Sequence, residues 1–86
     1  MTDNQKLWDK MKLQDEKLAK QVYVSEGFLT IDVEYEYNIE IARCNTPEKI
    51  LAWVLHLSEK TWMTVEIMER FVQTALREAG LAIPSV

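Results

Sequence analysis

The most hydrophobic stretch of the chain is ILAWVLHL, residues 50–57, in which seven of eight residues are apolar. A helix start signal precedes it: Thr46 can accept an N-cap hydrogen bond, Pro47 suits the first helical position, and Glu48 suits the positive helix end. The pattern predicts a helix over about 47–60. Because apolar residues occur on nearly every side of it, we expect a central core helix that other elements cover on several sides.

Length and composition indicate one ordinary globular domain, residues 1–86, with 48% hydrophobic and 28% charged residues. The single cysteine, Cys44, excludes an internal disulfide, and no apolar run at the start resembles a secretory signal. The run at 50–57 is far shorter than the roughly 20 residues that a membrane-spanning helix needs. We therefore expect a cytoplasmic protein without a membrane span.

The clearest strand signal lies upstream of the hydrophobic run. Residues 22–24 form a short β-prone segment, residues 25–27 supply a turn with Gly27, and residues 28–41 then alternate strictly between apolar and polar side chains. This pattern predicts a β-hairpin with a long second strand. Since strands commonly have about 5 or 6 residues, either this strand breaks near Tyr37 and Asn38, or its unpaired part meets another chain. A homodimer with a shared sheet is the favoured solution.

The other segments complete an α+β fold. Residues 3–20 favour a helix with a thin apolar face, so that residues 1–20 form either a peripheral arm or a segment ordered by a partner. Thr64 can cap an amphipathic helix over about 65–79, Gly80 can end it, and residues 81–86 form a tail. The expected order is helix, hairpin, and two antiparallel-packed helices, assembled as a homodimer through the long strand or the helices.

Catalytic and metal-binding chemistry finds little support in the residue pattern. His56 is the only histidine, and with Glu59 one turn later it offers at most two of the three or four ligands that a metal site needs. Cys44 precedes a helix start, which can lower a thiol pKa, but it has no identifiable partner base. We expect both residues to be structural, and we predict no enzyme activity and no cofactor.

Acidic residues are concentrated in one part of the chain, whose net charge is −4. Residues 21–42 contain five acidic residues and no Lys or Arg, which argues against a general nucleic-acid binder. Four of these acids are expected along the outer face of the long strand: Asp32, Glu34, Glu36 and Glu40. They form either a solvated strand face or a binding surface for a basic protein partner. Trp62, between the two later helices, is either a lid on the core or an exposed binding anchor.

Two resemblances bear on function. The segment HLSEKTWMT, residues 56–64, with the preceding TPE start at 46–48, resembles small uncharacterised proteins of bacteriophages and other mobile elements, over roughly residues 35–80. This resemblance implies a bacterial accessory protein and transfers no functional residue. The order strand, helix, helix also resembles the ribbon-helix-helix repressors, although the outward carboxylates here would repel phosphate.

The favoured hypothesis is a non-enzymatic interaction module that binds a host or phage protein through Asp32, Glu34, Glu36, Glu40 and Trp62. Two alternatives stay open. One is a dimeric DNA-binding regulator, in which Arg70, Arg77 and the N-terminal lysines would supply the contacts. The other is an inhibitor that imitates nucleic-acid phosphates with its carboxylates.

Overall fold

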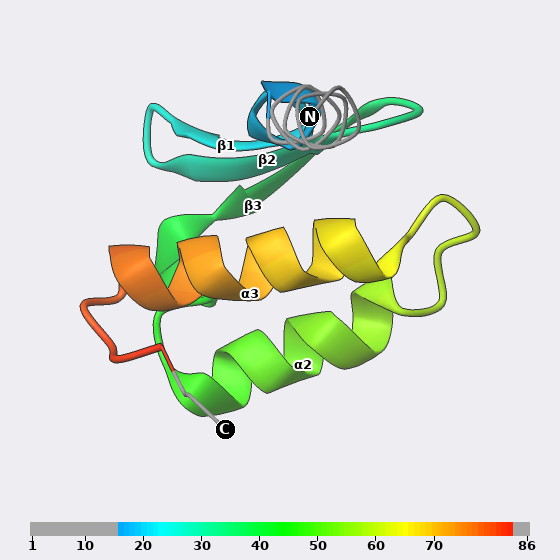
Figure 1. The fold of residues 1–86 in the computed structure, drawn as a ribbon. Helices are drawn as coiled ribbons and strands as arrows, with labels where there is room; N and C mark the ends of the chain where they lie inside the picture. Colours follow the sequence, from blue (N-terminus) through cyan, green and yellow to red (C-terminus); the bar gives the residue numbers. More distant parts are fainter. Residues whose placement is uncertain (1–15, 84–86) are drawn as a thin grey trace, which may run out of the picture.

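The computed structural model describes residues 16–83, which form an α+β fold with a three-stranded antiparallel sheet (Figure 1). Residues 16–21 are helical and lead directly into the sheet, and Leu18 packs against the core. The predicted helix over 3–20 is thus present in this part, and residues 3–15 lie outside the described range. The fold class follows the prediction.

The sheet is a meander of β1 (Val22–Ser25), β2 (Phe28–Asp32) and β3 (Glu36–Glu40). Glu26 and Gly27 join β1 to β2 with φ angles of 51° and 82°, and two successive positive φ angles are typical of a tight hairpin turn. The predicted turn at 25–27 is confirmed. In the second hairpin Asp32 pairs with Glu36, and residues 33–35 form the connection.

The predicted long strand over 28–41 is wrong, because the chain reverses at residues 33–35 and folds the alternating stretch back on itself. Leu29 pairs with Ile39, so both halves of the stretch supply the same core face. Ile41 already belongs to a short 3-10 helix, η1 (Ile41–Arg43). The alternating stretch therefore finds its partner strand within one chain, because β3 pairs with β2.

Two antiparallel-packed helices follow, α2 (Pro47–Leu57) and α3 (Val65–Glu78). Their starts agree with the predicted caps: Thr46 Oγ1 accepts from Lys49 N at 3.3 Å, and Thr64 Oγ1 accepts from Ile67 N at 3.2 Å. Helix α2 ends at Leu57, three residues before the predicted end. Beyond α3, Gly80 has a φ of 70°, as its predicted role as a helix stop requires.

We expected the helix that contains residues 50–57 to be the central core helix, and the structure shows that this prediction is wrong. Helix α3 lies between the sheet and α2, and it contacts β1, β2 and α2 (Figure 1). Its buried residues are Ile67, Phe71, Thr74, Ala75 and Leu76. In α2 only Ile50 and Leu57 are buried, whereas Leu51 and Leu55 are exposed. The central core helix is therefore α3, and α2 forms an outer layer.

Candidate protein-binding surface

Three of the four predicted acidic site residues meet at the tip of the β2–β3 hairpin. Asp32 ends β2, Glu36 begins β3, and these two residues are direct cross-strand partners, while Glu34 lies in the connection between them. All three are exposed. Like charges directly opposite each other in a sheet destabilise it, so this arrangement carries a cost that the fold has to offset elsewhere. We define Asp32, Glu34 and Glu36 as the acidic tip.

The acidic tip has no cationic partner among residues 16–83, because the one ion pair in that range joins Arg43 Nε to Glu40 Oε2, at 4.0 Å. Its negative charge also reaches the neighbouring strand. The pKa of the Tyr23 phenol is raised, first by partial desolvation and then by the charges of Glu36 and Asp32 and a hydrogen bond to Glu36. The two carboxylates thus act on β1 as well.

Glu40 is separate from the acidic tip. It ends β3 four residues after Glu36, about 13 Å away along a strand, and it pairs with Arg43. The predicted row of four carboxylates along one strand is therefore wrong. Three carboxylates gather at the hairpin tip and the fourth lies at the opposite end of β3.

An aromatic cluster adjoins the acidic tip. Tyr35, Tyr37 and Trp62 lie with ring centroids 6.2 to 6.3 Å apart, and Trp53 of α2 meets Tyr37 edge-on at 6.3 Å. Such tilted and edge-to-face pairs contribute beyond the area that they bury. Trp62 is half-buried and packs against the core, as a lid on the core would, and it also supports Tyr35, which is 51% exposed.

His56 and Lys60 complete this cluster on its α2 side. His56 Nε2 lies 3.1 Å from the Tyr37 hydroxyl, and the His56 ring meets Trp53 edge-on at 5.7 Å. Lys60 Nζ lies 5.6 Å from the centroid of the Tyr37 ring, within the range of a cation–π contact. This contact with the Tyr37 hydroxyl agrees with the structural role that we expected for His56.

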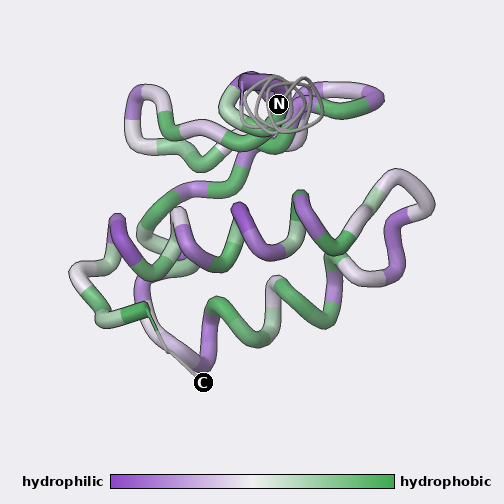
Figure 2. Tube along the Cα trace, in the orientation of Figure 1, coloured by the Kyte–Doolittle hydropathy of each residue, from purple (hydrophilic) through white to green (hydrophobic). Residues whose placement is uncertain are grey.

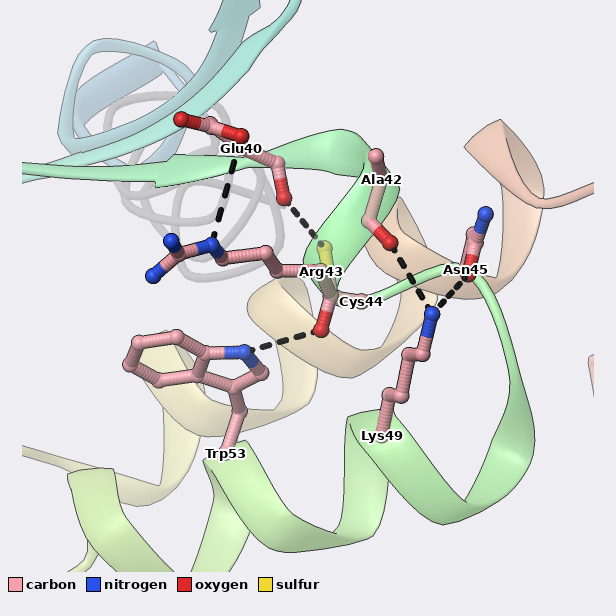
Figure 3. A network of polar contacts seen from close by, with 7 residues as sticks. All are labelled: Glu40, Ala42, Arg43, Cys44, Asn45, Lys49 and Trp53. Carbon is pink, nitrogen blue, oxygen red and sulfur yellow. Dashed lines mark hydrogen bonds and ion pairs between the residues drawn. The ribbon is translucent and has the colours of Figure 1, made fainter.

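A polar network fixes the junction between β3 and α2 (Figure 3). Trp53 Nε1 donates to the Arg43 carbonyl at 3.0 Å, and Lys49 Nζ donates to the Ala42 carbonyl at 3.2 Å and to Asn45 Oδ1 at 3.3 Å. Two of these bonds give partners to the Ala42 and Arg43 carbonyls, which lie beyond the end of β3 and so have no partner in the sheet. They hold α2, and with it Trp53, in a fixed position relative to β3.

Cys44 lies inside the same junction, is buried, and its thiol points to the Glu40 carbonyl at 3.8 Å. Burial raises the pKa of the Cys44 thiol, which is the opposite of the lowering that a reactive cysteine before a helix would have. Cys44 therefore acts as a small core residue, in agreement with the structural role that we expected.

The aromatic cluster is the part of the surface that sequence reasoning missed. Tyr35 and Tyr37 read as ordinary core positions of a long strand, and only the reversal at 33–35 brings Tyr35 to the surface beside the acidic tip. A usable signal was present, since Asp32, Glu34 and Glu36 are poor strand formers that are crowded into five residues.

Comparisons with known proteins add no relative: no family model, no curated protein and no solved structure matches this chain. Within residues 16–83, no group of three or more His, Cys, Asp or Glu side chains is placed to hold a metal ion. None of the helices in that range combines the length and apolar character needed to cross a membrane. The arrangement that stands out is the acidic tip with the exposed ring of Tyr35.

Proposed function

We propose that this chain is a non-enzymatic protein-interaction module, which binds a basic protein partner through the acidic tip and Tyr35. The observation that carries the proposal is the gathering of three exposed carboxylates at one hairpin tip, without an ion pair to any Lys or Arg of residues 16–83. Carboxylates so placed attract a positively charged partner and speed its association at low salt.

Tyr35 gives this surface more than charge. Its ring is half exposed, and its position is fixed from behind by Tyr37 and Trp62. An arginine of the partner can stack on such a ring while its guanidinium pairs with a neighbouring carboxylate. We therefore propose an arginine-bearing partner, with Tyr35 as an anchor between Glu34 and Glu36.

Binding of DNA as a ribbon-helix-helix regulator is the weaker proposal. The strand that precedes the two helices, β3, carries exposed Glu36 and Glu40, which would repel phosphates. The prediction that the chain belongs with phage and mobile-element accessory proteins stays a prediction, as does homodimer formation. An inhibitor that imitates nucleic acid would use the same acidic tip, and competition by duplex DNA for the captured partner would distinguish it.

The test compares protein capture by two variants of equal net charge. Glu34→Lys/Glu36→Lys reverses the acidic tip, and Glu16→Lys/Glu78→Lys reverses two exposed acids elsewhere. We expect the wild-type chain to capture a basic protein from bacterial lysate at low salt, the control variant to retain it, and the tip variant to lose it. Equal capture by both variants, or capture that high salt does not weaken, would contradict the proposal.

A further inference from the structure

Helix α2 presents an apolar face that the described part of the chain does not cover. Leu51 is 59% exposed and Leu55 is 63% exposed, and their spacing of four residues places them on one side of the helix. Figure 2 shows hydrophobic residues along most of α2, whereas α3 alternates between hydrophobic and hydrophilic residues. The exposed leucines therefore form a stripe and are not isolated surface residues.

A hollow lies beyond the C-terminal end of this stripe, where α2 ends and α3 begins. Ser58, one turn beyond Leu55, donates from Oγ to the Leu55 carbonyl at 2.7 Å and lines the hollow, whose volume is about 540 Å³. Val65, which is 78% exposed, also lines it. The remaining lining residues are Met63, Thr64, Met68 and Glu69. Methionine side chains adapt to varied apolar partners, so the hollow is suited to receive an inserted side chain. We call Leu51, Leu55 and this hollow the α2 groove.

The charges beside the α2 groove are acidic. Glu48 lies three residues before Leu51 in the first turn of α2, Glu59 lies two residues beyond the end of α2, and Glu69 lines the hollow. The nearby lysines turn elsewhere, since Lys49 Nζ bonds to the Ala42 carbonyl and Lys60 Nζ lies over Tyr37. An apolar stripe with carboxylates at both ends complements an apolar stripe that is bordered by cations.

We propose that the α2 groove binds an amphipathic helix of a partner protein, with apolar anchors on one face and Lys or Arg beside them. Peptide helices dock in this manner through residues at positions i, i+3, i+4 and i+7. A second copy of this chain fits less well, because antiparallel pairing of α2 with itself brings Glu48 of one copy near Glu59 of the other. An anionic membrane surface would meet the same carboxylates and be repelled.

The test uses two synthetic helical peptides of about 18 residues, long enough for several helical turns. Both carry leucine at positions i, i+3, i+4 and i+7; one has lysine and the other glutamate at the polar positions. Fluorescence anisotropy measures their binding to the full chain. Leu51→Gln/Leu55→Gln removes the stripe, and Phe28→Gln removes an exposed apolar residue of the sheet as a matched control. Circular dichroism checks that both variants keep their fold.

We expect the lysine peptide to bind, with a dissociation constant at least tenfold higher for Leu51→Gln/Leu55→Gln and unchanged for Phe28→Gln. Glu48→Lys/Glu59→Lys should also weaken binding, and the glutamate peptide should not bind. The tip variant Glu34→Lys/Glu36→Lys should bind the lysine peptide as the wild type does, which separates this groove from the acidic tip.

Absence of saturable binding, equal affinity for both peptides, or no effect of the leucine substitutions would overturn the proposal. A dimer in analytical ultracentrifugation that dissociates in Leu51→Gln/Leu55→Gln would also overturn it, because the occupant would then be a second copy. If only the tip variant Glu34→Lys/Glu36→Lys weakened peptide binding, the peptide would bind at the acidic tip. That result would overturn the proposal for the α2 groove.

Discussion

Helix α2 is apolar on almost every side and lies at the edge of the molecule, whereas α3 has a clearly divided surface and lies at the centre (Figures 1 and 2). Phe71 and Ala75 of α3 are almost fully buried, and Leu51 and Leu55 of α2 are mostly exposed. The helix with the larger share of apolar residues is therefore not the more buried of the two. A helix between two layers needs only a wide enough apolar face, and the exposed apolar residues of α2 form the surface on which we propose that a partner helix docks.

The largest expected effect falls on α3. Phe71→Ala removes a fully buried ring from α3, the helix between the sheet and α2, and should lower the free energy of unfolding by about 3–5 kcal/mol. Urea unfolding followed by circular dichroism measures this loss, and Phe71→Leu gives a smaller, measurable step if the alanine variant does not fold. A loss below about 1 kcal/mol for Phe71→Ala would contradict the central position of α3.

A smaller contrast is expected within α2 itself. Leu57→Ala empties a fully buried site and should cost about 2–5 kcal/mol, whereas Leu55→Ala, on the exposed side, should change stability by at most about 0.5 kcal/mol. The same urea titration compares the two variants. Equal losses would mean that Leu55 is covered in solution, and a loss for Leu55→Ala that depends on protein concentration would identify self-association as the cover.

The smallest effect concerns the junction between β3 and α2, at alkaline pH. Burial raises the pKa of the Cys44 thiol in the folded chain, so the unfolded chain releases this proton at lower pH than the folded chain does. The contribution of Cys44 to stability is therefore complete below the ordinary thiol pKa and is lost as the pH rises through the raised value.

Thermal unfolding between neutral and alkaline pH, compared with Cys44→Ala, isolates this contribution from that of Tyr23, whose pKa is also raised. We expect the wild type to lose more stability than Cys44→Ala as the pH rises. Parallel pH profiles for the two proteins would show that the thiol is accessible to solvent in the folded state.

Local signals in the sequence were enough to predict several features. Thr46 and Thr64 cap their helices as expected, and Gly27 and Gly80 adopt positive φ angles at the turn and the helix end. Each of these features depends on residues within one turn of one another, where steric freedom and a single hydrogen bond decide the conformation.

The reversal at 33–35 has a weaker signal, the crowding of the poor strand formers Asp32, Glu34 and Glu36, which does not fix the position of a turn. Val33 and Tyr35 continue the alternation of a strand, and no glycine, proline or asparagine marks the turn. The chain reverses because pairing β3 with β2 lowers the free energy of the folded state. This pairing joins residues that are apart in the sequence, so the alternation pattern gives no sign of it. The acidic tip and the aromatic cluster depend on this reversal. The sequence pattern singled out the acidic residues and Trp62 as candidates, and their arrangement in space could not be derived from it.

The order of the elements along the chain has a consequence for synthesis of the protein. The strands are neighbours in sequence and can pair as soon as they are made, but the helix that covers their apolar face, α3, comes last among the elements from β1 onward. Until residues 65–78 have left the ribosome, Leu29, Ile31 and Ile39 lack their cover. The nascent chain therefore exposes the apolar side of its sheet from the completion of β3 until α3 is available, and a chaperone that recognises such surfaces would meet it in this interval.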